Sequence, residues 1–243
     1  MRSVALIIGV FVASSCAHVP RGNATTEGAL WRFDNLERIG GYQVRVEGQP
    51  QPISTRKGTA IAFDGVKDAL LIPAHPLAGA RTFTFEAIFR PDGGSFEQRW
   101  FHLAQADPAA PPGLYPPVKA SGPRFLFEIR VVDNSWYLDA FTAGPGYSRT
   151  LAVPEKRFAV GRWYSVAQTY DGHTYRSYVN GEVQAEAPLA FAPQGPGYAS
   201  VGTRIDRRNY FHGAIYAARF TPRALSPGEF LKVPPALAPS RMP

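Results

Sequence analysis

The amino-acid sequence predicts an all-β fold in which two antiparallel sheets pack as a sandwich. The clearest support is residues 162–183, where aromatic and β-branched segments are separated by Asp171-Gly172 and Asn180-Gly181. These dipeptides favour tight hairpin turns because Asn, Asp and Gly tolerate the positive φ that such turns need. Similar short segments recur along the chain, and no helix longer than a turn or two is expected. Several strands at this spacing are typical of a sandwich.

The first 16 residues read as a secretory signal. Arg2 is followed by an apolar run from Val4 to Ala13, which is too short to span a membrane as a mature helix. Ala13-Ser14-Ser15-Cys16 resembles the lipobox of bacterial lipoproteins, whose cysteine is acylated; ordinary cleavage near the small residues is the alternative. Cys16 is the only cysteine, so no intrachain disulfide can form. Ala17 favours, by the same resemblance, the outer membrane. The expected location is the bacterial envelope, with a secreted or periplasmic protein as the alternative.

After this signal we expect three parts that differ in composition. Residues 17–27 are polar and predict a flexible tether, residues 28–231 one domain, and residues 232–243 a disordered Pro-rich tail. Long loops are expected over 106–123 and 143–150. Strands are predicted at 29–34, 41–48, 61–72 (a pair around Asp64-Gly65), 82–90, 99–105, 124–133, 135–142, 163–170, 174–179, 182–187 and 211–221.

Alternation along two strands predicts which faces are buried. Phe83, Phe85 and Phe89 share one face of a strand, and Glu86 lies in the opposite row. The row of Phe125, Phe127 and Ile129 likewise stands opposite Glu128 and Arg130. A sandwich must bury the apolar rows, so the polar rows face outward or line a groove.

The string WYSVAQTYDGHTYRSYVNG at 163–181 resembles the central signature of laminin G-like domains in the concanavalin A-like lectin/glucanase superfamily. AIAFDGVKDALLIP at 60–73, TFTFEAIFRPD at 82–92 and the closing segment 200–230 resemble other parts of it in the same order. The resemblance covers about 28–231 and implies a jelly-roll sandwich with a short helix over 222–230. It leaves function open, because the superfamily includes lectins, adhesion modules, hydrolases and lyases.

The charge balance favours anionic partners. The chain has a net charge of +7, which loss of residues 1–16 would lower to +6, and several arginines, including Arg204, Arg207 and Arg208, lie near its end. No nucleic-acid motif is present. An acidic polysaccharide or lipid headgroups fit an exported protein better, although a merely solvated basic face is the plain alternative.

We therefore predict a glycan or other surface ligand on a polar sheet face containing Glu86, His102, Glu128 and Arg130. Because successive side chains of a strand point to opposite faces, each of these residues lies opposite a buried apolar row. Arg130 offers a planar fork for a carboxylate or sulfate, and Trp100 or Trp136 could form a stacking wall. For each aromatic ring the alternative is core packing, and for His102 it is a satisfied strand histidine.

Two further hypotheses come from the resemblance. Glucanases of the superfamily carry Glu-x-Asp-x-x-Glu, and the matching positions here are Glu128, Arg130 and Asp133. Because an offset of five places Asp133 on the opposite strand face, binding is preferred to glycoside hydrolysis or lyase chemistry. A purely structural envelope module is the third interpretation.

Laminin G-like relatives also hold Ca²⁺, for which Asp34, Asp64 and Asp68 are the candidate ligands. The spacing of the histidines does not suggest zinc.

Overall fold

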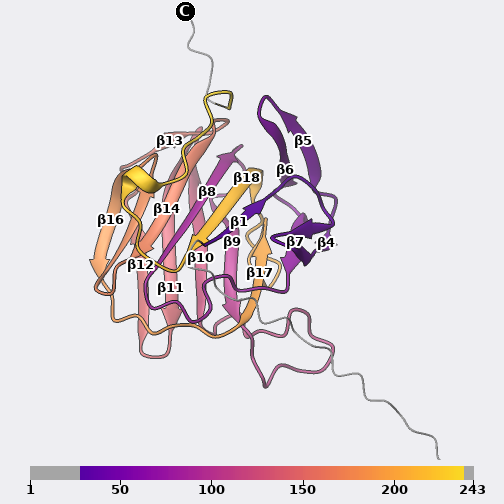
Figure 1. Ribbon diagram of the computed structural model, residues 1–243. Coiled ribbons are helices and arrows are strands. Elements are labelled where there is room, and N and C mark those ends of the chain that lie inside the picture. The colour runs from indigo at the N-terminus through magenta and orange to yellow at the C-terminus, as the bar shows by residue number, and fades with distance from the viewer. Residues whose placement is uncertain (1–27, 238–243) are drawn as a thin grey trace, which may run out of the picture.

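The computed structural model describes residues 28–237 of this protein. Two large antiparallel sheets pack face to face, which confirms the predicted sandwich (Figure 1). A short 3-10 helix, Pro227–Glu229, is the one helical element in this range. No helix among these residues is long and apolar enough to cross a membrane. Cys16 and the predicted tether lie outside the described residues.

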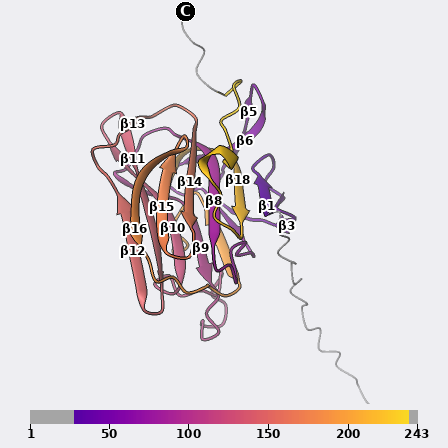
Figure 2. The same ribbon diagram turned by 60° about the vertical axis from the view of Figure 1, so that its left-hand side comes forward.

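The first sheet has eight strands and forms the front layer of Figures 1 and 2. Its strands run in the order β16-β15-β14-β8-β18-β6-β5, and β1 also pairs with β18. Their bounds are β1 Ala29–Arg32, β5 Gln51–Thr55, β6 Gly58–Asp64, β8 Phe83–Pro91, β14 Tyr164–Tyr170, β15 Thr174–Val179, β16 Glu182–Pro188 and β18 His212–Thr221.

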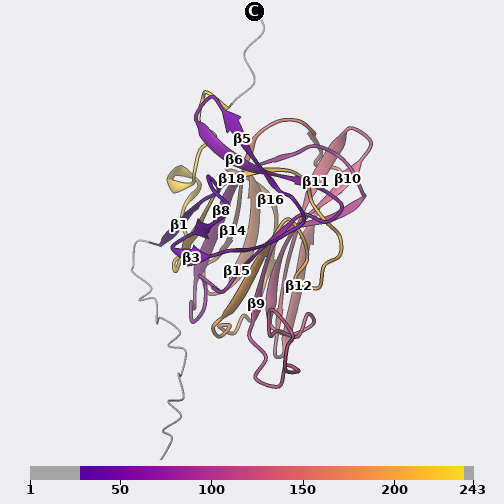
Figure 3. The same cartoon turned by 90° about the vertical axis from the view of Figure 1, so that its right-hand side faces the viewer.

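The second sheet also has eight strands and carries the site described below. Its order is β12-β11-β10-β9-β17-β7-β4, and β13 pairs with β11. Figure 3 shows β10, β11 and β12 in one layer and β8, β14 and β18 in the other. The bounds are β4 Arg45–Glu47, β7 Ala69–Ile72, β9 Glu97–Gln105, β10 Arg124–Val132, β11 Ser135–Gly144, β12 Tyr147–Ala152, β13 Phe158–Ala159 and β17 Gly197–Val201; a separate pair is β2 Arg38–Ile39 and β3 Tyr42–Gln43.

The core between the sheets is built from the apolar rows that alternation predicts. Phe83, Phe85 and Phe89 from β8 are fully buried, and Phe85 stacks on Phe127 of β10 with 3.7 Å between ring centroids. Phe125 packs edge to face on Phe83. Large aromatic side chains contribute most of the apolar area that such a core removes from water.

The meander of β14, β15 and β16 confirms the predicted hairpins. Asn180 has φ 51° and Gly181 has φ 84°, the two positive values that a type I′ turn requires. Val166 and Val179 face each other across β14 and β15, and both are buried, as predicted. Turn chemistry and alternation together were therefore sufficient to identify this part of the fold.

Several segments differ from the sequence-based expectation, and one of them is β17, which was not predicted although it pairs with β7 and β9. Residues 51–55 were not assigned to a strand, yet they pair with β6 as the edge strand β5. The loop expected over 143–150 is wrong, because β11 continues to Gly144 and β12 starts at Tyr147. The intervening turn is tight, with Gly146 at φ 77°. Gly and Pro at 144–146 suggested a long loop but mark a hairpin turn instead.

The carboxy-terminal segment covers part of the outer face of the first sheet, as the yellow ribbon in Figure 1 shows. Leu225 and Phe230 pack on Ala167 and Tyr178 of β14 and β15. Glu86 of β8 lies beneath this segment and accepts hydrogen bonds from Arg219 Nε (2.6 Å) and the Leu231 backbone N–H (2.5 Å). This face of the first sheet is thus closed by the chain itself at Glu86.

Candidate functional site

The outer face of the second sheet holds a pocket of about 410 Å³, which we call the arginine pocket. Strands β9, β10, β11 and β12 form its floor, and the 202–211 loop forms one wall. Of its twelve lining residues, two are apolar, Leu126 and Phe141, and the other ten are polar or charged, so the pocket is predominantly polar. Its charged lining residues are Glu97, Arg99, Arg124, Glu128, Arg130, Asp139, Arg204 and Arg208.

Strand β10 supplies the long axis of the pocket. Arg124, Leu126, Glu128 and Arg130 alternate with the buried phenylalanines, so all four side chains lie on the outer face. At about 3.3 Å per residue, the backbone from Arg124 to Arg130 spans about 20 Å. The pocket can therefore contact an elongated ligand along the strand.

The β10–β11 hairpin brings a second carboxylate into this row. Asp133, with φ 54°, occupies the turn, and the register places Glu128 directly opposite Asp139. Directly opposed side chains in an antiparallel pair have Cβ atoms about 4.5–5.5 Å apart. Two carboxylates are thus neighbours on the pocket floor, and both are almost fully buried.

A β-bulge in β9 places Arg99 beside them. Phe127 pairs with Phe101, whereas the next residue, Glu128, pairs with Arg99, so Trp100 is the extra residue. Two residues of the bulged strand oppose one on its partner, and the alternation of faces is interrupted there. Arg99 therefore joins the outer face while both Trp100 and Phe101 enter the core.

These side chains form one ion network. Arg130 Nη1 bonds to Glu128 Oε2 (2.9 Å), and its Nη2 bonds to Asp139 Oδ2 (2.7 Å) and lies 3.2 Å from Glu97 Oε1. Arg99 Nε lies 3.1 Å from Glu128 Oε1, and Arg99 Nη2 pairs with Glu97 Oε1 (2.5 Å). Each buried carboxylate thus has a cationic partner, which a buried charge requires.

The carboxyl groups of the network differ in acidity. Burial raises the pKa of Asp139 to about 6, and the negative charge of Glu128 adds to this shift. The hydrogen bond from Arg99 lowers the pKa of Glu97, against the effect of burial. Burial therefore brings the pKa of Asp139 close to neutral.

The loop between β17 and β18 completes the wall. It starts at Gly202, with φ 85°, where a Cβ would collide with the Phe63 ring and the Asp68 carbonyl. Ile205 donates its backbone N–H to Nδ1 of His102 (3.0 Å), and Asn209 donates to Glu97 Oε2 (3.2 Å). These contacts fix the part of the loop that carries Arg204 and Arg208.

Several polar atoms of the pocket have no partner within residues 28–237. They are Oδ1 of Asp139, Nη1 of Arg99 and Nε of Arg124, and all three are buried. Asp139 as a whole is only 5% exposed. An unpartnered buried donor or acceptor costs about 1–3 kcal/mol, so its presence on a pocket wall favours a polar ligand there.

The prediction that Trp100 or Trp136 forms a stacking wall for a ligand is wrong. Trp100 is fully buried because the bulge turns it into the core, where it stacks on Phe89 with 4.7 Å between centroids. Trp136 is also fully buried and packs on Phe158 and Tyr164. Its neighbour Tyr137 faces outward, as the β10–β11 register requires.

The expected convergence of four polar residues is only partly correct. Glu128 and Arg130 share the arginine pocket. Glu86 belongs to the other sheet and is closed off by the carboxy-terminal segment. His102 is on the correct face but is fully buried beneath Ile205, and burial keeps its pKa well below the ordinary value. Alternation gives the face of a strand but not the sheet it belongs to or the loops that cover it.

The role expected for Arg130 also changes. Its Nη1 and Nη2 atoms are both engaged by carboxylates of the protein, and its side chain is only 15% exposed. Arg130 therefore organises the acidic side chains of the floor rather than offering a free fork to a ligand.

The three predicted calcium ligands do not form one cluster in the described structure. Asp64 Oδ1 accepts the backbone N–H groups of Val66, Lys67 and Asp68, the pattern of a turn. Asp68 accepts from Gln49 and Asp64, while Asp34 bonds to Asn35. Within residues 28–237 no group of three or more His, Cys, Asp or Glu side chains could hold a metal ion. The calcium hypothesis stays a prediction.

Some pocket residues were missed at the sequence level although a signal existed. A two-residue turn at Asp133-Asn134 fixes the β10–β11 register, so Asp139 could have been placed opposite Glu128. Arg124 shares the parity of Glu128. Arg99 could not have been found, because nothing in the sequence marks the bulge. Phe96, which is 57% exposed with its ring 5.9 Å from Arg130 Cζ, was also missed.

Family comparison agrees with this architecture. A laminin G-type family model, described as the concanavalin A-like lectin/glucanases superfamily, matches residues 64–230. No curated protein sequence matches the chain significantly.

Solved structures with a similar fold include domain 4 of AbnA, a GH43 extracellular arabinanase from Geobacillus stearothermophilus, in complex with arabinotriose. That match has a TM-score of 0.59 and 15% identity, over 83% of this chain and 94% of the other. The receptor-binding domain of botulinum neurotoxin D matches with a TM-score of 0.57 and 10% identity, over 85% and 52%. The serotype D ligand-binding domain in complex with N-acetylneuraminic acid matches at 0.55 and 11%, over 82% and 48%. The chain spans about half of each toxin structure.

Proposed function

Because this chain belongs to the concanavalin A-like lectin/glucanase superfamily, we propose that it binds a carbohydrate in the arginine pocket. The observation that carries the proposal is the buried, unpartnered Asp139 Oδ1 on the floor of this pocket. A pocket of about 410 Å³ lies within the range of small-molecule sites, about 300–1,000 Å³.

The chemistry of the lining suits sugar hydroxyls. Asp139 Oδ1 can accept a hydrogen bond, and Arg99 Nη1 and Arg124 Nε can donate one. Because the floor is held by the network around Arg130, these groups are in place before a ligand arrives. A preorganised polar pocket with unpaired donors and acceptors favours a polyhydroxylated ligand over an apolar one.

Phe96 supplies an apolar surface next to this network. Its ring is exposed and contacts the guanidinium of Arg130, which lines the pocket. Flat rings stack on the apolar faces of sugars while neighbouring polar groups bond to hydroxyls. Phe96 thus takes the role for which Trp100 and Trp136 are unsuited.

The carbohydrate complexes among the structural neighbours support the same class of ligand. Domain 4 of AbnA is in complex with arabinotriose, and the serotype D domain is in complex with N-acetylneuraminic acid. At 15% identity or less these neighbours give no residue of the site, so the proposal rests on the pocket itself.

A second candidate function is glycoside hydrolysis. Glu128 and Asp139 oppose each other in the pocket, and Asp139 has a pKa of about 6, as a general acid requires. Against this, Arg130 bonds to both carboxylates at once. A nucleophile held in this way is less free to attack the sugar, so binding is the preferred function.

The envelope location is part of the proposal. The lipobox-like residues 13–16 support a lipid anchor at Cys16, and Ala17 supports the outer membrane. Acyl chains contribute about 0.8 kcal/mol per buried CH₂, so a multiply acylated terminus would hold the glycan-binding domain at the membrane surface.

A glycan array probed with the full chain in mild detergent tests the proposal. We expect binding to a restricted set of glycans and its loss with Asp139→Ala. Each glycan that binds is then incubated with the protein and the products are separated. Intact glycan supports binding, cleaved glycan supports hydrolysis, and a protein that binds no glycan refutes the proposed function.

A further inference from the structure

We infer that the ligand is an acidic sugar whose carboxylate or sulfate group lies against Arg124 and Arg208, with its hydroxyl groups towards Asp139. This inference rests on the glycan-binding function proposed above and deepens it. The supporting observations are the distribution of charge along the pocket and the hydrogen bonds, ion pairs and exposure of its guanidinium groups.

Charge is unevenly distributed between the two ends of the pocket. The end around Arg130 contains three carboxylates and two guanidinium groups, so it carries one excess negative charge when all are ionised. The other end contains Arg124, Arg204 and Arg208, with Asp206 as their close counter-charge. This cationic end carries two excess positive charges, which an anionic group would offset.

Arg124 is the arginine of the cationic end that has unused binding capacity. It belongs to none of the ion pairs within residues 28–237 and donates Nη1 to the Gly122 carbonyl (2.8 Å). Its Nε is buried without a partner, and its guanidinium lies over the Phe141 ring, 4.9 Å from the centroid. Stacking on Phe141 holds the planar fork in one orientation, as recognition of a carboxylate or sulfate needs.

The cationic end is electrostatically unfavourable without an anion. Burial and the positive charge of Arg204 both lower the pKa of Arg124, against the favourable negative charges of Glu128 and Asp206. Burial lowers the pKa of Arg204, where the effects of Arg208 and Arg99 act against the favourable charge of Asp206. Guanidinium groups held close together and partly out of water repel one another, and a bound acid group would relieve this repulsion.

Arg208 is the residue of the cationic end that is most accessible to a ligand. Its side chain is 63% exposed and forms an ion pair with Asp206 through Nη2 (2.8 Å). Arg204, in contrast, is nearly buried, with Nη1 on Asp206 and Nη2 on the Ala120 carbonyl (3.0 Å). An incoming acid group would therefore meet Arg208 at the mouth and Arg124 on the floor.

The opposite end sets the orientation of the ligand. Asp139 Oδ1 can accept a hydroxyl proton, and the excess negative charge around it repels an acid group. A neutral sugar would leave the two excess positive charges of the cationic end unbalanced. The pocket therefore discriminates between acidic and neutral sugars by charge and geometry together.

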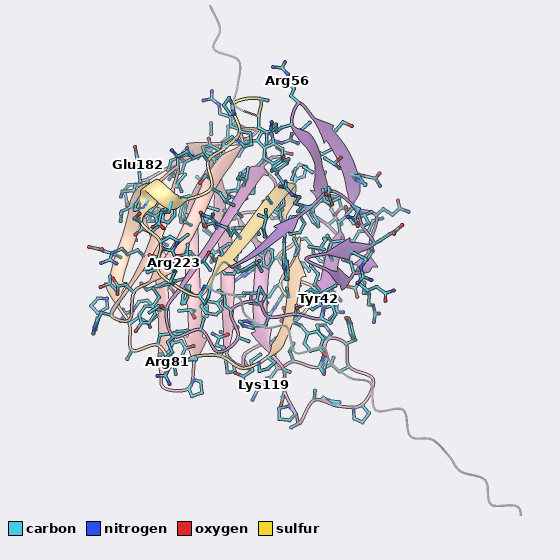
Figure 4. All side chains as sticks on the ribbon, in the orientation of Figure 1. Tyr42, Arg56, Arg81, Lys119, Glu182 and Arg223 are labelled. Atoms are coloured by element: carbon cyan, nitrogen blue, oxygen red, sulfur yellow. The ribbon has the colours of Figure 1, made fainter. Side chains whose placement is uncertain are left out.

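Isothermal titration calorimetry of the full chain in detergent at low salt tests this. The probes are trigalacturonic acid, its uncharged methyl ester, and a sulfated galactose trisaccharide. We expect one of the two acidic probes to bind at least tenfold more tightly than the ester, and the better one identifies the acid group. Arg124→Gln should remove this preference, whereas Arg223→Gln should keep it. Arg223 lies over the front sheet, on the other side of the sandwich (Figure 4).

Arg208→Gln is a second variant, because the exposed side chain of Arg208 can be changed without disturbing the floor. It should lower the affinity for the acidic probe and leave the affinity for the ester unchanged. Equal affinity for acid and ester, or a preference that survives both substitutions, refutes the acidic-sugar inference and leaves glycan binding standing. Absence of binding by these probes and by every glycan on the array refutes the proposed function itself.

Discussion

Glu128 of β10 and Asp139 of β11 face each other across the pocket floor, and one guanidinium group, that of Arg130, bonds to both. Like charges at opposed positions destabilise a sheet unless a counter-charge is present. Arg130 is therefore essential to the floor, and the acidic pair it holds gives the pocket its free acceptor.

Removal of the Glu128 charge should destabilise the fold. Glu128→Gln leaves Arg99 and Arg130 nearly buried with one carboxylate fewer, and breaking a buried pair costs about 3–5 kcal/mol. At roughly 2–4 °C per kcal/mol, the melting temperature should fall by about 6–20 °C. Thermal unfolding followed by circular dichroism measures this. Glu182→Gln, at an exposed position in Figure 4, is the control and should change little; an equal effect of both substitutions would show that the network contributes no special stability.

The pH dependence of stability should report Asp139. Its folded pKa of about 6 lies above the unfolded value of about 3.9. The folded state therefore binds more protons, and this contribution to stability is complete below pH about 4 and lost as the pH rises through about 6. Two pKa units correspond to about 3 kcal/mol. Urea unfolding between pH 4 and 8 should show that the stability of the native protein relative to Asp139→Asn declines across this window. A difference in unfolding free energy between the two proteins that stays constant from pH 4 to 8 would contradict the raised pKa of Asp139.

Phe96→Ala should weaken glycan binding without a change in folding. The ring is exposed, so its loss creates no cavity, and an aromatic contact contributes about 0.5–1.5 kcal/mol. We expect the dissociation constant to rise about twofold to tenfold in calorimetry, with an unchanged melting temperature. Unchanged affinity would remove Phe96 from the binding site, and Phe96→Tyr should retain binding if stacking is its role.

Lipidation at Cys16 is a separate prediction that concerns residues outside the described structure. Cys16→Ala should release the protein from membranes, since the single cysteine is the acylation site that the lipobox-like sequence offers. Incorporation of labelled palmitate, followed by fractionation, measures both effects. Failure of the native protein to incorporate the label would exclude the anchor, whatever its glycan affinity.

Local patterns predicted much of the fold but only part of the site. The turn at Asn180-Gly181 and the buried row containing Phe85 follow from residue chemistry and alternation, and both are confirmed. Trp100 was placed incorrectly because the bulge beside Arg99 reverses the strand parity. Glu86 was placed incorrectly because pairing between distant strands decides which sheet a strand joins. Site geometry of this kind depends on contacts between segments far apart in the sequence.

The most direct test of the proposed site is nuclear magnetic resonance of the isotope-labelled chain during titration with a glycan that binds on the array. We predict that the largest chemical-shift changes fall on backbone amides of β10, β11 and the 202–211 loop, and on the Nε–H signals of Arg99 and Arg124. Amides of β14 and β15, in the other sheet, should shift least. Changes concentrated on the first sheet, with the Arg124 signal unmoved at saturation, would show that the arginine pocket is not the binding site.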